Sequence, residues 1–269
     1  NISRTKKTQK YLFQLSSGKL IESVLMKEGK RVTACLSTQV GCAVDCGFCA
    51  TAKMGFIQNL TSGEILDQYL HLQKISEYKI TNIVFMGMGE PFLNYDNTIE
   101  SANLLHHPEG INMGAWRITI STAGIIRKIN QYTIEGHPYK LAVSLNASNE
   151  LQRLKTMPIT KSNSFKELIN SSKNYTLQTK KKITFEYVML SNINDSSSDA
   201  RALIRQLGSI NCKLNLIPYN EIDGDFKRPS NEKIDNFLKI LAHAPFPVTI
   251  RWSKGQEIDA GCGQLATIH

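Results

Sequence analysis

The chain has 269 residues, and its 32 lysines and arginines exceed its 23 aspartates and glutamates by nine. With 41% hydrophobic and 20% charged residues, the composition excludes a disordered or fibrous protein and predicts a sizeable core. No apolar run approaches the roughly 18 residues that cross a bilayer, and the first residues lack a secretory signal, so we expect a cytoplasmic protein without a membrane partner. The positive charge suits either a polyanionic partner such as nucleic acid or an ordinary solvated surface.

Three short antiparallel strands are predicted at the start of the chain. Runs with strand-like alternation are separated by turns at Gly18 and Gly29, which predicts strands over 10–15, 19–26 and 31–37. We expect residues 1–30 to form a small β extension and residues 31–269 to form the main domain.

Beyond residue 60 the pattern becomes an alternation of helices and strands. Apolar residues at helical spacing, several preceded by capping Ser, Thr or Asn, predict helices over 61–75, 94–105, 125–134, 164–175, 197–207 and 230–242. Strands are predicted between and after them over 82–86, 117–121, 140–145, 183–190, 213–217 and 247–252. This order is typical of βαβ units with a parallel sheet.

Alternation within these strands favours a partial α/β barrel over an open doubly wound sheet. Thr119 and Ser121 share one face of their strand, whereas the isoleucines beside them share the other. Strands of a doubly wound sheet are apolar on both faces, so a polar face is expected to line a barrel interior. In such folds the site lies at the carboxyl ends of the strands.

Three of the six cysteines lie within eight residues, at Cys42, Cys46 and Cys49. Gly41 and Gly47 disfavour a helix here and favour a loop that wraps around a ligand. Three thiolates suit an iron–sulfur cluster in which one iron has no protein ligand and can bind a substrate. Zinc or simple packing is the alternative, although structural zinc usually takes a fourth protein ligand and no histidine lies near this loop.

The loop resembles the cluster loop of the radical S-adenosylmethionine (SAM) superfamily. Five ordered motifs further resemble the RlmN-type dual-specificity RNA methyltransferases: residues 35–42 (CLSTQVGC), 85–91 (FMGMGEP), 118–124 (ITISTAG), 214–220 (LNLIPYN) and 258–265 (IDAGCGQL). The resemblance runs from about Glu22 to Leu265.

This resemblance implies a radical SAM enzyme with a partial (β/α)6 barrel. Its cofactors would be a [4Fe-4S] cluster on Cys42, Cys46 and Cys49, and SAM. The implied reaction is methylation of carbon 2 of an adenosine in 23S rRNA, and in some tRNAs. The electron donor would be a flavodoxin-type reductase system or a similar one, and the enzyme would be a monomer. The family's N-terminal accessory domain is expected to be absent from this chain.

The resemblance also implies the catalytic residues. Cys262 would carry a methyl group that a SAM-derived radical activates. Cys35 would release the product by forming a transient disulfide with Cys262, and Glu22 would accept the ring proton. A cation near Cys35 would lower the pKa of its thiol and favour the thiolate.

Seven residues match the family's SAM contacts, and most of them lie at or just past strand ends. Glycines there let the backbone approach a ligand, and a carboxylate can accept hydrogen bonds from the ammonium group of SAM. These residues are Gly89, Glu90, Ser121, Ser144, Leu145, Asn146 and Asn220.

Two other functions remain open from the sequence. A Cfr-like enzyme would methylate carbon 8 of the adenine, although Pro91 after Glu90 favours the carbon-2 branch. A non-catalytic RNA-binding module with a structural metal would need neither Cys262 nor Cys35. Cys212 is expected to be a buried core residue in each case.

Overall fold

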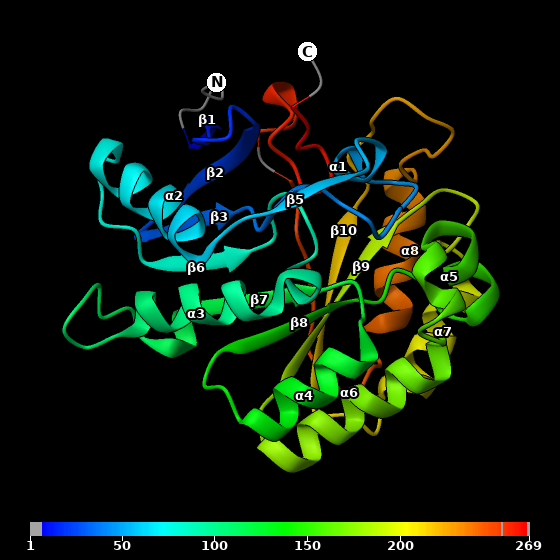
Figure 1. The fold of residues 1–269 in the computed structure, drawn as a ribbon. Coiled ribbons are helices and arrows are strands. Elements are labelled where there is room, and N and C mark those ends of the chain that lie inside the picture. The colour runs from blue at the N-terminus through cyan, green and yellow to red at the C-terminus, as the bar shows by residue number, and fades with distance from the viewer. Residues whose placement is uncertain (1–6, 254, 268–269) are drawn as a thin grey trace.

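The computed structural model describes residues 7–253 and 255–267, so the first six residues of the expected extension lie outside the described part. Nine strands form one curved sheet (Figure 1). In spatial order they are β1 (Thr8–Gln14), β2 (Leu20–Glu28), β3 (Arg31–Leu36), β6 (Asn82–Phe85), β7 (Ile118–Thr122), β8 (Lys140–Ser144), β9 (Ile183–Met189), β10 (Cys212–Pro218) and β11 (Val248–Ile250). In this order the strands from β3 to β11 are parallel, β2 pairs antiparallel with β3, and β1 pairs antiparallel with β2.

All six expected long helices are present, and they cover the outer side of the sheet (Figure 1). Their N-terminal caps explain where several begin: the hydroxyls of Thr61, Ser164, Ser196 and Ser230 each accept a hydrogen bond from the first turn. The helices are α2 (Ser62–Ile75), α3 (Tyr95–His106), α4 (Ile126–Glu135), α6 (Phe165–Thr179), α7 (Ser197–Leu207) and α8 (Asn231–Leu241).

The alternation predicted for the strands is confirmed. Ile118, Ile120 and Leu141 are fully buried in the core between sheet and helices. On the opposite face, Ser121 and Ser144 line an interior cavity. Because β1 and β11 stand at the two ends of the strand order, the barrel is partial, as expected.

Several short elements were not predicted. A two-stranded antiparallel sheet pairs β4 (Gln39–Gly41) with β5 (Phe56–Asn59), and α1 (Ala50–Lys53) lies between them. The short helix α5 (Glu150–Thr156) follows β8. Elements of three to seven residues are too short to show a periodicity, so only their tertiary contacts establish them. Four single turns of 3₁₀ helix complete the structure: η1 (Pro91–Asn94), η2 (Ala115–Arg117), η3 (Pro158–Lys161) and η4 (Gln256–Ile258).

Within the described residues, the structure contains no helix that combines the length and the apolar character required to span a membrane.

Candidate active site

The three clustered cysteines lie on the loop between β4 and α1, as the two glycines predicted. Cys42 follows β4 directly, and Cys49 is the N-cap of α1. The amide of Cys49 donates a hydrogen bond to the carbonyl of Cys46 (3.0 Å). Asp45, between the first two cysteines, has a left-handed φ of 57°, which turns the loop back on itself.

Gly41 is required by the close approach of two backbone segments at the start of this loop. Its φ is +71°, and a Cβ placed on it would lie 1.8 Å from the carbonyl oxygen of Gly55. That carbonyl accepts a hydrogen bond from the amide of Cys42 (2.9 Å). The glycine therefore lets β5 hold the first cysteine in place.

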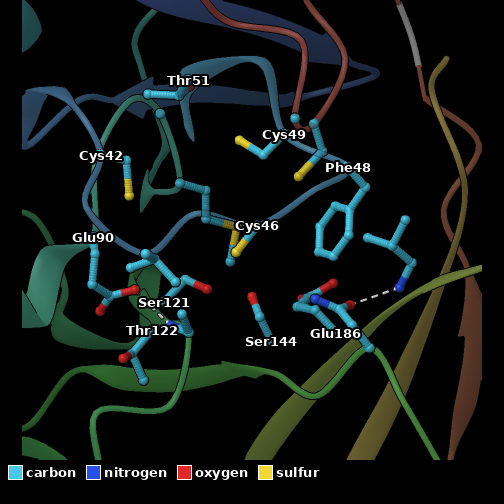
Figure 2. A pocket seen from close by; sticks show the side chains of 18 of the residues that line it. Cys42, Cys46, Phe48, Cys49, Thr51, Glu90, Ser121, Thr122, Ser144 and Glu186 are labelled. Atoms are coloured by element: carbon cyan, nitrogen blue, oxygen red, sulfur yellow. Dashed lines mark hydrogen bonds between the residues drawn. The ribbon is translucent and has the colours of Figure 1, made fainter. Parts of the chain in front are cut away.

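The loop forms one wall of a cavity at the carboxyl ends of the barrel strands. Figure 2 shows Cys42, Cys46 and Cys49 on one side of this space, and Ser144 and Glu186 on the strands facing them. The volume of this cavity is about 140 Å³.

The arrangement of the three thiols indicates which kind of metal group this loop can bind. Among the described residues, no three His, Cys, Asp or Glu side chains are placed to hold a single metal ion. A mononuclear zinc site needs its ligands to converge on one point. In a cubane cluster each thiolate binds a different iron, which suits three thiols that line one cavity without converging. The donor set therefore fits an iron–sulfur cluster.

Glu90 projects into the cavity from the turn after β6. Its carboxylate accepts hydrogen bonds from the amides of Phe92 (2.9 Å) and Ala123 (2.6 Å), and only 4% of the residue is exposed. Burial raises the pKa of Glu90 to about 7, although these bonds act in the opposite direction. A cationic group entering the cavity would favour its ionised form.

The other residues expected at the SAM site fall into two groups. Gly89, Ser121, Ser144 and Asn146 line the cavity with Glu90. Leu145 and Asn220 are not among the described residues of its wall. Leu145 is fully buried, whereas the side-chain amide of Asn220 donates a hydrogen bond to the carbonyl of Cys262 (2.9 Å).

The C-terminal segment brings Cys262 to the cluster loop. The carbonyl of Gly263 accepts a hydrogen bond from the amide of Ala50 (2.7 Å), and the carbonyl of Leu265 accepts one from the hydroxyl of Thr51 (2.6 Å). Cys262 lies between these anchors and Asn220, and it lines the cavity. Its side chain is open to the cavity, yet the surrounding protein raises its pKa to about 11.

Cys35, on β3, is buried, and Cys262 and Arg251 lie near enough to its thiol to act on its pKa. Burial raises the pKa of its thiol to about 12, and the neighbouring Cys262 adds to this effect. Arg251 lowers the pKa of both thiols, so the expected cation exists. The expected net lowering is nevertheless wrong, because desolvation outweighs the attraction of Arg251.

Glu22 is buried rather than displayed on a surface hairpin. It shares a face of β2 with Val24, which pairs with Cys35 across the sheet. Its carboxylate forms an ion pair with Lys10 (2.8 Å) and accepts a hydrogen bond from the amide of Ala266 (3.0 Å). The C-terminal segment therefore contacts Glu22, which is not part of the described cavity wall.

Two charged residues of the wall were missed by the sequence analysis. Glu186, on β9, receives hydrogen bonds from the side chain of Asn215 (3.1 and 3.2 Å), and Arg251 follows β11. Glu186 faces the cavity from β9, and Arg251 faces it from the position directly after β11, inside the strand predicted over 247–252. A charged residue on the inward face of a strand was the signal that could have found them.

Comparison with known proteins gives consistent matches. The family model of the radical SAM superfamily matches residues 36–204. A protein of Thermotoga petrophila named probable dual-specificity RNA methyltransferase RlmN is 46% identical over 98% of this chain and 77% of its own length. The dual-specificity RNA methyltransferase RlmN of Lawsonia intracellularis is 47% identical over 97% of this chain and 76% of its own. The crystal structure of a radical SAM methyltransferase from Sphaerobacter thermophilus superposes with a TM-score of 0.94 at 43% identity, over 98% of this chain and 78% of that one.

Proposed function

This chain belongs to the RlmN family of dual-specificity RNA methyltransferases within the radical SAM superfamily, and from that premise we propose that it methylates carbon 2 of an adenosine in 23S rRNA and in tRNA. One observation carries the proposal: Cys262, from the far end of the chain, lines the same cavity as the three cysteines of the β4–α1 loop. A structural zinc site could also take a fourth cysteine, but its ligands must converge on one ion, and no three such side chains of the described residues do so.

The reaction needs radical chemistry because carbon 2 of adenine lies between two electron-withdrawing nitrogens and does not attack a methyl cation donor. A [4Fe-4S] cluster and SAM, when bound, supply a carbon-centred radical that removes a hydrogen atom from an unreactive methyl group. Cys42, Cys46 and Cys49 would hold the cluster. Gly89, Glu90, Ser121, Ser144 and Asn146 would orient SAM from the strand ends, with Glu90 accepting from its ammonium group.

Cys262 would carry the methyl group into the cavity on its sulfur. After the methyl carbon has bonded to the adenine, and the adduct has lost its ring proton to Glu22 and one electron, for which the oxidised cluster would be the acceptor, the Cys35 thiolate would attack the Cys262 sulfur. The carbon–sulfur bond would break, its electron pair would remain on the methyl carbon, and a proton would complete the methyl group as a Cys35–Cys262 disulfide forms. Arg251, which favours both thiolates, would assist this step.

Leu145 and Asn220, which lie outside the described cavity wall, would contribute to SAM binding. Glu22 would accept the proton of the adenine ring. Because Ala266 donates to the Glu22 carboxylate, the C-terminal segment would have to shift before that carboxylate meets the RNA. Asn220, which binds the Cys262 backbone, would then also link SAM binding to the position of Cys262. An external flavodoxin-type reductase system would supply electrons to the monomer.

The test is an anaerobic assay of the reconstituted protein with methyl-labelled SAM and RNA. We expect 2-methyladenosine in the digested RNA, identified by mass spectrometry against 2-methyl and 8-methyl standards. Cys262→Ala should abolish methyl transfer without reducing the iron content. Cys212→Ala is the matched control, since this cysteine is buried in the core and should leave transfer intact. Methyl transfer by Cys262→Ala would contradict the proposal, and an 8-methyl product would replace it with the carbon-8 reaction.

A further inference from the structure

Arg153, on α5, is completely buried (0% exposed). Removing a guanidinium from water is unfavourable, and buried cations usually have an anionic partner. No carboxylate of the described residues lies within ion-pair distance of Arg153, whose hydrogen bonds all go to uncharged oxygens. Its positive charge is therefore held in place without being neutralised.

The partners of Arg153 lie at the strand ends that form the cavity. Its Nε donates to the carbonyl of Leu145 (3.2 Å), and Nη2 donates to the carbonyls of Ser144 (3.3 Å) and Ala123. Its Nη1 donates to the hydroxyl of Thr160 (2.8 Å). One side chain thus ties the end of β8 and the turn after β7 to the segment after α5.

The same side chain lies behind the groups expected to bind the cofactors. The peptide of Ala123 connects Glu90 to Arg153: its amide donates to Glu90, and its carbonyl accepts from Arg153. The helix also contacts the cluster loop, since the carbonyl of Thr156 accepts from the amide of Gly47 (3.0 Å). Burial lowers the pKa of Arg153 to about 10, whereas Cys46, Glu150 and Glu90 act in the opposite direction, so all three are near enough to interact with its charge.

We propose that Arg153 is a positioning residue that places a positive charge without a direct ion pair behind the cluster loop, where it favours the reduced state of the cluster held by Cys42, Cys46 and Cys49. The inference rests on the proposed function. When the cluster accepts one electron and no proton, its net charge becomes more negative by one. A fixed cation in a dry environment stabilises that state, because buried charges are weakly screened. Net charge and hydrogen bonding are among the factors that set the potential of such clusters.

An arginine is suited to this position for a second reason. Its planar fork donates to several carbonyls at once and remains charged when it is desolvated, whereas a lysine ammonium loses its proton more easily on burial. The residue can thus order the strand ends and carry the charge at the same time.

The experiment measures the midpoint potential of the reconstituted cluster by a redox titration monitored by electron paramagnetic resonance, with iron and sulfide counted per chain. Arg153→Gln keeps hydrogen-bond donors and removes the charge, so we expect a potential more negative than that of the parent at equal iron content. Arg153→Lys keeps the charge at low pH, where its ammonium is protonated, and should there stay near the parent value. Arg127→Gln, an exposed arginine on α4, is the matched control and should leave the potential unchanged.

Each outcome decides between the two possible roles of Arg153. An Arg153→Gln protein with a full cluster and the parent potential would overturn the proposal and leave Arg153 as a purely structural residue. If Arg153→Gln does not fold, Arg153→Lys carries the test at low pH, where its ammonium is protonated: a parent-like potential there supports the role of the charge, and a more negative potential there refutes it. A parent protein that binds no cluster would instead refute the proposed function, so the two failures are distinguishable.

Discussion

Substitution of Gly41 by alanine tests how the fold positions the cluster loop. A left-handed φ costs a residue with a Cβ about 1–2 kcal/mol, and the added Cβ would lie 1.8 Å from the Gly55 carbonyl oxygen. The backbone must therefore shift, which breaks the hydrogen bond from the amide of Cys42 at a further cost of about 1 kcal/mol. We expect Gly41→Ala to lower the free energy of unfolding by about 3 kcal/mol and to reduce cluster content, because Cys42 loses its anchor.

Gly55→Ala is the matched control. Gly55 also has a left-handed φ, +66°, but an added Cβ would contact nothing within 4 Å. It should show the backbone cost alone, about 1–2 kcal/mol, with normal iron content. Urea unfolding of the apoproteins and iron analysis after reconstitution measure the two effects. Equal stability loss and equal iron content in both variants would refute the reasoning from the close approach.

Three further predictions concern charged groups in or beside the cavity. Arg251→Gln should raise the pKa of Cys262 above about 11 and slow its alkylation by iodoacetamide in the apoprotein, and an unchanged rate would count against the contact. Lys10→Met should leave the buried Glu22 without its ion pair and cost about 3 kcal/mol in urea unfolding. Adding Glu22→Gln to this variant should recover most of that loss, because the unpaired buried carboxylate is removed. If the losses of the two single variants simply add, Lys10 and Glu22 are not coupled. Burial raises the pKa of Glu90 from 4.5 to about 7, so the folded apoprotein keeps a proton that the unfolded chain loses, and stability falls as the pH rises through this window. Glu90→Gln removes this titration, so its free energy of unfolding should decline less with pH than that of the parent, by about 3 kcal/mol at pH 7. An unaltered pH profile would refute the raised pKa of Glu90.

Much of the fold was predictable because its signals are local. The six long helices and the barrel strands follow from periodicity over ten or so residues and from capping hydroxyls such as that of Thr61. The pair β4–β5 and the helix α5 were not predictable in this way. Their stability comes from contacts such as that of Gly47 with Thr156, which lie far apart in the sequence and leave no periodic trace.

The residues of the candidate site also differ in how well the sequence predicts them, for the same reason. Spacing and glycines identified Cys42, Cys46 and Cys49 as a ligand loop, because thiol ligands on one loop must be close in sequence. Glu186 and Arg251 were missed, since each is a single charged residue, one within a strand and one directly after a strand, and becomes informative only when the sheet curves and turns it inward.

By itself, the sequence determined the six long helices and the barrel strands, the inward polar faces of those strands and the chemistry that three clustered thiols can support. Only the tertiary structure decided that Cys262 meets the cluster loop, that the carboxylate of Glu22 is paired with Lys10 and covered by Ala266, and that burial outweighs Arg251 at Cys35. The physical reason is that desolvation and the electrostatic field at a point depend on every chain segment packed around it. These quantities are set by packing and not by the order of residues along any one segment.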